Sequence, residues 1–409
     1  MFDLPSGKNK KSFSPQALVN LGLIIFAVFS PFSIAGAQSG ICLALLGWVW
    51  KIIDRRSLTW ERSFFELPVI VFLGAYLISI IFSQDRALSL RSLGDEWLLA
   101  FPFLLINNLK DEAFIRKLIN LIFLISGLVA IYAIWQHYTG IDLIRPKTLD
   151  LILPSGKFRS TAFFDLPLTY SFYAMLVGLV SFCLGINERK NSSKIFYFIV
   201  SVLCVTGNLF TYTRSALFAQ VFAFFIYFFL SKSPHKKKEM LAVTGYFILI
   251  YLIDPGILGR TLVAAKAGSF AEADIRSVIW STSFNIFKDY PVFGIGFGNF
   301  PEFYQIYLKV PSQIFGHAHN DFLNVAVNAG IIGFLAFVFF WVFLLKNLLR
   351  RYKEKEQGYV KAFILGGVLS VVAFLFASQF QCYYTDAEDH MILFFFLGLS
   401  EAIARIHSK

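Results

Sequence analysis

Charged residues are scarce in this chain of 409 residues, and that scarcity excludes most soluble folds. Asp, Glu, Lys and Arg together make up 15% of the sequence, whereas 57% is hydrophobic. A soluble domain has about a quarter of its residues charged. With a mean hydropathy of +0.64, the composition indicates an integral membrane protein.

Cysteine is also rare, and its spacing excludes two classes of small scaffold. The four cysteines form no C-x-x-C pair, so neither a zinc ribbon nor a disulfide framework is predicted. The dinucleotide-binding fingerprint is missing as well. Residues 294–298 read G-x-G-x-G with no strand before them, and we interpret them as a tight turn.

Long apolar runs are what the sequence has in abundance. Each is about 15–25 residues long, which suits a hydrocarbon core of roughly 30 Å. The runs lack the alternation of strands, so they predict helices that satisfy their own backbone in lipid. We therefore expect an all-α polytopic membrane protein with about 12 transmembrane helices, a single integral membrane domain over residues 1–409. The expected spans are residues 17–34, 39–53, 67–82, 93–106, 118–135, 166–184, 195–210, 216–230, 240–253, 322–345, 360–380 and 391–406.

The basic residues predict the orientation. With the N-terminus in the cytoplasm, most of the 37 Lys and Arg fall in the inner connections, among them Arg62, Lys110, Arg351 and Arg405. An even number of spans returns the C-terminus to the same side. The net charge of +11 is then a topology signal, so a membrane-lipid environment is expected and no nucleic-acid partner.

Two outer connections are long, at residues 137–165 and 254–321. Loops of such length usually carry function or helices of their own. In the second we expect a helix over residues 274–288, ended by Pro291 because proline cannot continue a helix.

Three arginines on the outer side stand next to apolar runs: Arg159, Arg214 and Arg276. Arg214 lies in a very short connection, where a charge at the membrane surface is usually functional. A guanidinium group matches phosphate oxygens bidentately. The alternative is an interfacial arginine that snorkels to lipid headgroups.

His317 and His319 form an H-x-H pair with Asp321 nearby. One of them could be a general base, since a neutral imidazole suits removal of a hydroxyl proton. The pair could also hold a metal, or be solvated. A metal would need further ligands, and the last outer loop offers Asp386, Glu388, Asp389 and His390. The same acidic loop could instead orient a base or bind an acceptor sugar.

One spacing resembles a known signature. His319 and Asn320, nine residues, Gly330, two residues and Gly333 fit the H-[NSQ]-x9-G-x-x-[GTY] pattern of bacterial O-antigen ligases. Further positions between residues 135 and 405 resemble that family in order, namely Gln136, Gly140, Arg159, Arg214, Arg276, Trp280, Asp289, Pro291, Gly294, Gly296, Gly298 and Phe300.

The resemblance implies a metal-independent, inverting glycosyltransferase of the membrane-embedded, GT-C-like type that needs no cofactor. The implied donor is O-polysaccharide on undecaprenyl pyrophosphate, and the implied acceptor is a sugar hydroxyl of lipid A–core. The enzyme would lie in the bacterial inner membrane, with loop 254–321 carrying part of a periplasmic active site.

The resemblance also assigns roles to residues. His319 would be the catalytic base, and Arg214, Arg276 and Arg159 would bind pyrophosphate. His317 is not part of the signature, and we treat it as a secondary candidate together with Asn320, Asp386 and Glu388.

Two other functions remain open. O-antigen polymerases of the same superfamily extend the polymer on its lipid carrier and need the same base and arginines. A transporter or flippase of lipid-linked sugars is a different class. It predicts broken, inverted-repeat helices and charges within the spans, whereas the polar groups here gather on one side.

Overall fold

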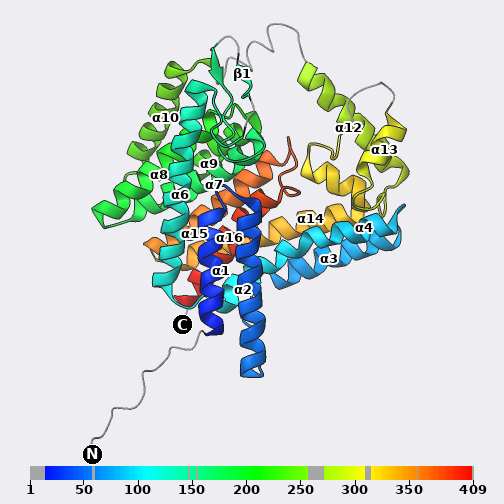
Figure 1. The fold of residues 1–409 in the computed structure, drawn as a ribbon, viewed down its shortest axis with the longest axis horizontal. Helices are drawn as coiled ribbons and strands as arrows, with labels where there is room; N and C mark the ends of the chain where they lie inside the picture. Colours follow the sequence, from blue (N-terminus) through cyan, green and yellow to red (C-terminus); the bar gives the residue numbers. More distant parts are fainter. Residues whose placement is uncertain are drawn as a thin grey trace, which may run out of the picture.

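The computed structural model describes residues 14–57, 60–145, 148–152, 155–256, 271–308, 315–356 and 358–407. Its regular structure is almost entirely helical, as expected (Figure 1). Two short strands, β1 (Leu151–Ile152) and β2 (Lys157–Phe158), form one antiparallel pair in which Leu151 faces Phe158.

The described helices follow one another along the chain, and several of the connections between them are long. The helices are α1 (Pro15–Phe29), α2 (Ile34–Arg55), α3 (Glu66–Ile81), α4 (Arg86–Leu93), the 3-10 helix η1 (Gly94–Ala100), α5 (Phe101–Asn108), α6 (Glu112–Thr139), α7 (Pro167–Asn187), α8 (Asn191–Leu209), α9 (Arg214–Leu230), α10 (Lys236–Ile253), α12 (Ala271–Asp289), α13 (Phe300–Tyr307), α14 (Asp321–Glu354), α15 (Tyr359–Ala377) and α16 (Ala387–Ile406).

Six of the described helices are long and apolar enough to cross a membrane: α2, α6, α7, α8, α14 and α15. Three more, α1, α3 and α9, are apolar but shorter. A polytopic helical membrane protein is therefore confirmed, whereas the expected number of 12 spans is not. The helix expected over residues 274–288 is present as α12.

One expected span is wrong in form. Residues 93–106 do not make a single helix, because η1 covers Gly94–Ala100 and the eight-residue α5 follows. Pro102 stands in the first turn of α5, where its missing N–H leaves no helical hydrogen bond unmade. The apolar run is therefore divided where the proline starts a new helix.

The first two spans also meet at a different place than expected. α1 ends at Phe29 and α2 already begins at Ile34, since Ser33 caps α2 by accepting a hydrogen bond from the Gly36 N–H at 3.2 Å. The two helices then pack closely through glycine. A Cβ atom on Gly22 would lie 2.5 Å from the carbonyl oxygen of Gly40.

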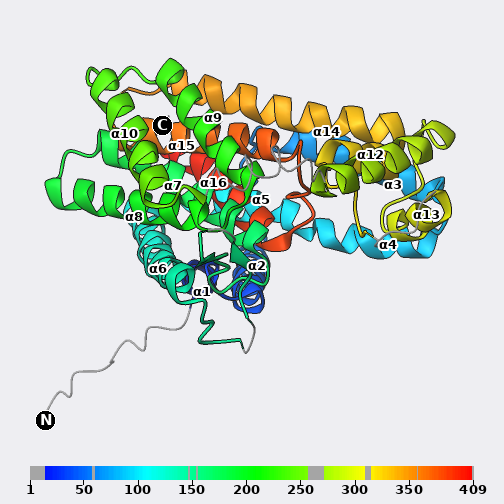
Figure 2. The same ribbon diagram turned by 90° about the horizontal axis from the view of Figure 1, so that it is seen from above.

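The core is built around α15 and α16. α15 packs against α7, α9 and α14, and α16 packs against α5. Both central helices are buried over most of their length. α3 and α14 lie side by side, with α12 over one end of α14 and α13 packed against α12 (Figures 1 and 2).

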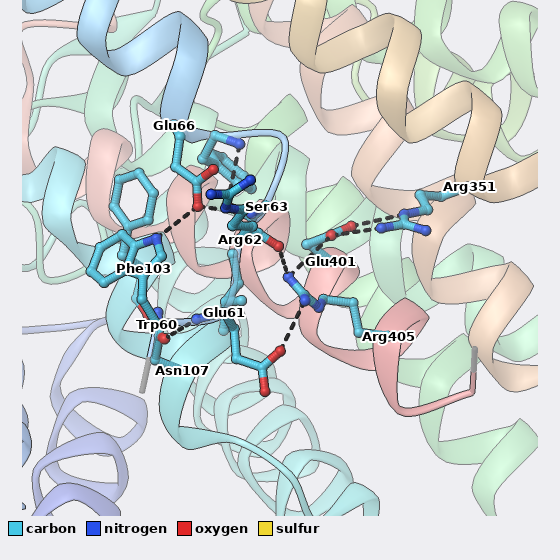
Figure 3. Close-up of polar contacts among 12 residues, drawn as sticks. Trp60, Glu61, Arg62, Ser63, Glu66, Phe103, Asn107, Arg351, Glu401 and Arg405 are labelled. Carbon is cyan, nitrogen blue, oxygen red and sulfur yellow. Dashed lines mark hydrogen bonds and ion pairs between the residues drawn. The ribbon is translucent and has the colours of Figure 1, made fainter. Parts of the chain in front are cut away.

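Basic residues assigned to the inner side from the sequence gather in one polar cluster (Figure 3). Arg351 of α14 binds the buried Glu401 of α16 at 2.8 and 3.0 Å. Arg405 binds Glu61 at 2.9 Å, and Lys110 lies 3.2 Å from the same carboxylate. Ion pairs thus join the ends of α14 and α16 to the connection before α3.

Candidate active site

His319 lies in the turn that leads into α14, in a backbone conformation that is uncommon for a residue with a side chain. Its φ of 49° is left-handed. Its Nδ1 atom lies 2.5 Å from Oε1 of Gln381. An amide oxygen can only accept, so this hydrogen bond assigns the proton to Nδ1 and leaves the lone pair on Nε2.

A cavity of about 210 Å³ brings together residues from five distant segments. His319 and Gln381 line it together with all three arginines singled out from the sequence, Arg159, Arg214 and Arg276. Positive charge and a proton acceptor therefore share one small space.

Local structure explains how the arginines reach this cavity. Arg214 is the first residue of α9, so its guanidinium stands beside a helix N-terminus, where backbone N–H groups favour an anion. Arg159 follows β2, and its Nε donates to the Thr211 carbonyl at 2.7 Å, which ties the hairpin to the connection before α9. Arg276 comes from α12.

Burial and charge keep the histidines neutral. Burial lowers the pKa of His319, and the nearby positive charge of Arg276 lowers it further, whereas the hydrogen bond that His319 donates to Gln381 opposes the shift. Burial and the neighbouring His319 lower the pKa of His317 to about 4. A neutral imidazole at pH 7 is the form that accepts a proton.

The first glycine of the H-[NSQ]-x9-G-x-x-[GTY] pattern is a structural requirement. Gly330 interrupts α14 with φ 64° and ψ −164°. The interruption frees two carbonyls, and Val327 accepts from the Ile295 N–H at 3.0 Å while Asn328 accepts from the Gly296 N–H at 2.8 Å. A Cβ atom on Gly330 would lie 2.2 Å from the Val292 oxygen.

The G-x-G-x-G run is a turn, as interpreted from the sequence, since Gly294, Gly296 and Gly298 all have positive φ. Sequence reasoning missed the residue that fixes this turn. The Nδ2 atom of Asn299 donates to Ser83 Oγ at 3.1 Å and to Ser89 Oγ at 3.2 Å, joining the turn to α4 and to the connection before it.

The residues after His319 hold Gln381 in place. Asn320 caps α14 by accepting from the Leu323 N–H at 3.0 Å, and it donates to the Gln379 carbonyl at 2.9 Å. The buried carboxylate of Asp321 accepts from the Tyr383 N–H at 3.0 Å. Hydrogen bonds before and after Gln381, at Gln379 and Tyr383, therefore hold its segment against the turn of His319. No signal in the sequence had indicated Gln381.

Asp386 and Glu388 lie elsewhere. Asp386 caps α16 and accepts from Thr169 Oγ1 at 2.7 Å. Burial and the adjacent Asp386 raise the pKa of Glu388 to about 7. Neither lines the described part of the cavity that holds His319. The described residues also contain no group of three His, Cys, Asp or Glu side chains placed to hold a metal ion.

Comparison with known proteins finds a family match over part of the chain. Residues 199–338 match the family model described as O-antigen ligase, a range that includes Arg214, Arg276 and His319 but not Arg159. The chain is also similar to an uncharacterized protein of Haemophilus influenzae. The two are 21% identical over 382 residues, which cover 87% of this chain and 90% of that protein.

Proposed function

We infer that this chain, which belongs to the O-antigen ligase family through residues 199–338, is a membrane glycosyltransferase that makes lipopolysaccharide. Its donor would be O-polysaccharide on undecaprenyl pyrophosphate, and its acceptor a sugar hydroxyl of lipid A–core. The observation that carries this proposal is the cavity in which His319 meets Arg159, Arg214 and Arg276.

The arginines would bind the donor pyrophosphate. Three guanidinium groups supply charge and paired N–H donors for phosphate oxygens. They also offset the negative charge that develops as the pyrophosphate leaves. Pyrophosphate is a good leaving group, so this reaction would require neither a metal nor a strong general acid.

His319 would activate the acceptor. Its Nε2 lone pair takes the proton of the sugar hydroxyl while the hydroxyl oxygen bonds to the anomeric carbon. The bond from that carbon to the pyrophosphate oxygen breaks, the pyrophosphate keeps the electron pair, and the configuration inverts. Gln381 Oε1 keeps the imidazole oriented and accepts from Nδ1–H throughout.

The site would face the periplasm from the bacterial inner membrane, with both termini in the cytoplasm. Two observations support this orientation. The basic residues assigned inside meet in the cluster of Arg351, Glu401 and Arg405, whereas the residues assigned outside meet in the cavity of His319. Segment 254–321 supplies Arg276 and His319, although its residues 257–270 and 309–314 lie outside the described part of the chain.

The test is transfer by the purified protein in vesicles that contain lipid A–core and an undecaprenyl-pyrophosphate-linked glycan. Mass spectrometry of lipid A–core should show the added glycan. If the lipid-linked glycan lengthens while lipid A–core stays bare, the protein is a polymerase. If labelled glycan crosses the vesicle membrane with no new glycosidic bond, it is a flippase.

A further inference from the structure

A second cavity, of about 410 Å³, is lined in part by the same turn that carries His319. His317 lines this second cavity, whereas His319 lines the first, and Ala318 between them is fully buried. The two imidazole rings are 4.4 Å apart. The turn therefore contributes one histidine to the lining of each cavity.

The lining of the second cavity differs from that of the first in charge. It holds the carboxylates Asp95 and Glu96 of η1, beside Trp97. Tyr76 and Phe297 also line it, stacked with ring centroids 3.9 Å apart. Carboxylates accept hydrogen bonds from hydroxyl groups, and aromatic faces cover apolar C–H surface, so the combination suits a saccharide.

Two buried polar atoms on this lining have no hydrogen-bond partner among the described residues. They are Nε2 of His390 and Oδ1 of Asn328, in side chains 5% and 3% exposed. Asn328 cannot turn freely, because its Nδ2 donates to the Asn324 carbonyl at 2.7 Å. Buried polar groups are ordinarily paired, so these two atoms point to a polar ligand.

His317 adds a donor to the same lining. Its Nδ1 accepts from the His319 N–H at 3.2 Å, which assigns its remaining proton to Nε2. The cavity thus offers both donors and acceptors at fixed positions, as the alternating oxygens of a sugar ring require.

We propose that the cavity of Asp95, Trp97, His317 and His390 binds the acceptor glycan, holding the sugar next to the one that reacts at His319. This rests on the proposed glycosyl transfer. The imidazole rings of His317 and His319, with centroids 4.4 Å apart, bring the two cavities close enough for neighbouring sugars of one glycan to occupy them. The carboxylates select an uncharged sugar or an amino sugar and disfavour a phosphorylated one, because like charges repel.

Asp95→Asn tests the subsite, because Asp95 is exposed and asparagine has nearly the same size as aspartate. Asp150→Asn is the matched control, an exposed aspartate of the other long outer connection. Initial rates are measured against lipid A–core and, separately, against the lipid-linked donor. The acceptor KM of Asp95→Asn should rise about tenfold, as for one lost charge-assisted hydrogen bond. Its donor KM and the control should stay unchanged.

Direct binding gives an independent readout. Core oligosaccharide, released from lipid A and freed of phosphate, is titrated into His319→Ala protein in nanodiscs by saturation-transfer NMR. Binding should weaken when the protein also carries Trp97→Phe. It should also weaken when the oligosaccharide keeps its phosphate groups. The proposed subsite is overturned if Asp95→Asn leaves the acceptor KM unaltered and Trp97→Phe leaves oligosaccharide binding unaltered. It is also overturned if Asp95→Asn raises the donor KM as much as the acceptor KM. Failure of the wild type to transfer any glycan would instead overturn the proposed function.

Discussion

His319 and Gln381 are 62 residues apart in the sequence, yet Nδ1 of one lies 2.5 Å from Oε1 of the other. This contact decides which imidazole nitrogen is free to act as a base. It depends on Asn320 and Asp321, which bind the segment around Gln381 at Gln379 and Tyr383.

Replacing Gln381 tests whether this orientation matters. Gln381→Leu removes the acceptor for Nδ1–H, so both tautomers become populated and kcat should fall about 10- to 100-fold, with little change in donor KM. Gln381→Glu keeps the acceptor and should retain most activity at a higher pH, because a carboxylate raises the pKa of His319. Equal losses in both variants would contradict an orienting role. Rate profiles over pH provide the measurement.

The pH dependence of kcat/KM reports the base directly. Burial and Arg276 lower the pKa of His319, so the neutral base persists as the pH falls through the ordinary histidine value. The acid limb of the profile should therefore lie below about pH 6.5. Arg276→Gln removes a like charge and should move that limb to higher pH. A limb that stays in place would show that Arg276 does not act on His319.

Lysine should not replace Arg214. If the guanidinium binds pyrophosphate through paired N–H groups, Arg214→Lys should lose nearly as much kcat/KM as Arg214→Ala, because an ammonium group cannot make that contact. Arg189→Lys, at the opposite end of α8 from the cavity, is the control. Recovery of full activity by lysine would reduce the role of Arg214 to simple charge.

Chelation separates the two interpretations of the histidine pair. The proposed mechanism draws on the arginines and on His319, so EDTA should leave the transfer rate unchanged. Rates before and after dialysis against EDTA provide the test. Loss of activity that zinc restores would favour a metal held by His317 and His319.

Gly330→Ala tests the kink in α14. The positive φ and the close Val292 oxygen should make alanine destabilising by at least about 2 kcal/mol. Gly245→Ala is the control, since its added Cβ atom meets nothing within 4 Å. Thermal unfolding in detergent should show a lower Tm for Gly330→Ala alone. Equal Tm values would mean that the kink relaxes without cost.

The sequence predicted the helical membrane fold and singled out His319 and the three arginines because both depend on local features. Apolar runs predict helices, and an arginine or histidine at the end of such a run stands out. It missed the division of one run at Pro102, although a proline is a local signal, and it could not predict the contacts of Gln381 and Asn299. Those contacts arise between segments far apart in sequence, and an amide side chain carries no signal of its partner.

The most direct test of the central claim compares wild-type protein, His319→Ala and His235→Ala for glycan transfer to lipid A–core. His235 stands in front of α10, on the lining of a different cavity. Wild type and His235→Ala should transfer at similar rates, and His319→Ala should be slower by about 10²- to 10⁴-fold. Near-normal transfer by a folded His319→Ala protein would contradict the assignment of His319 as the base.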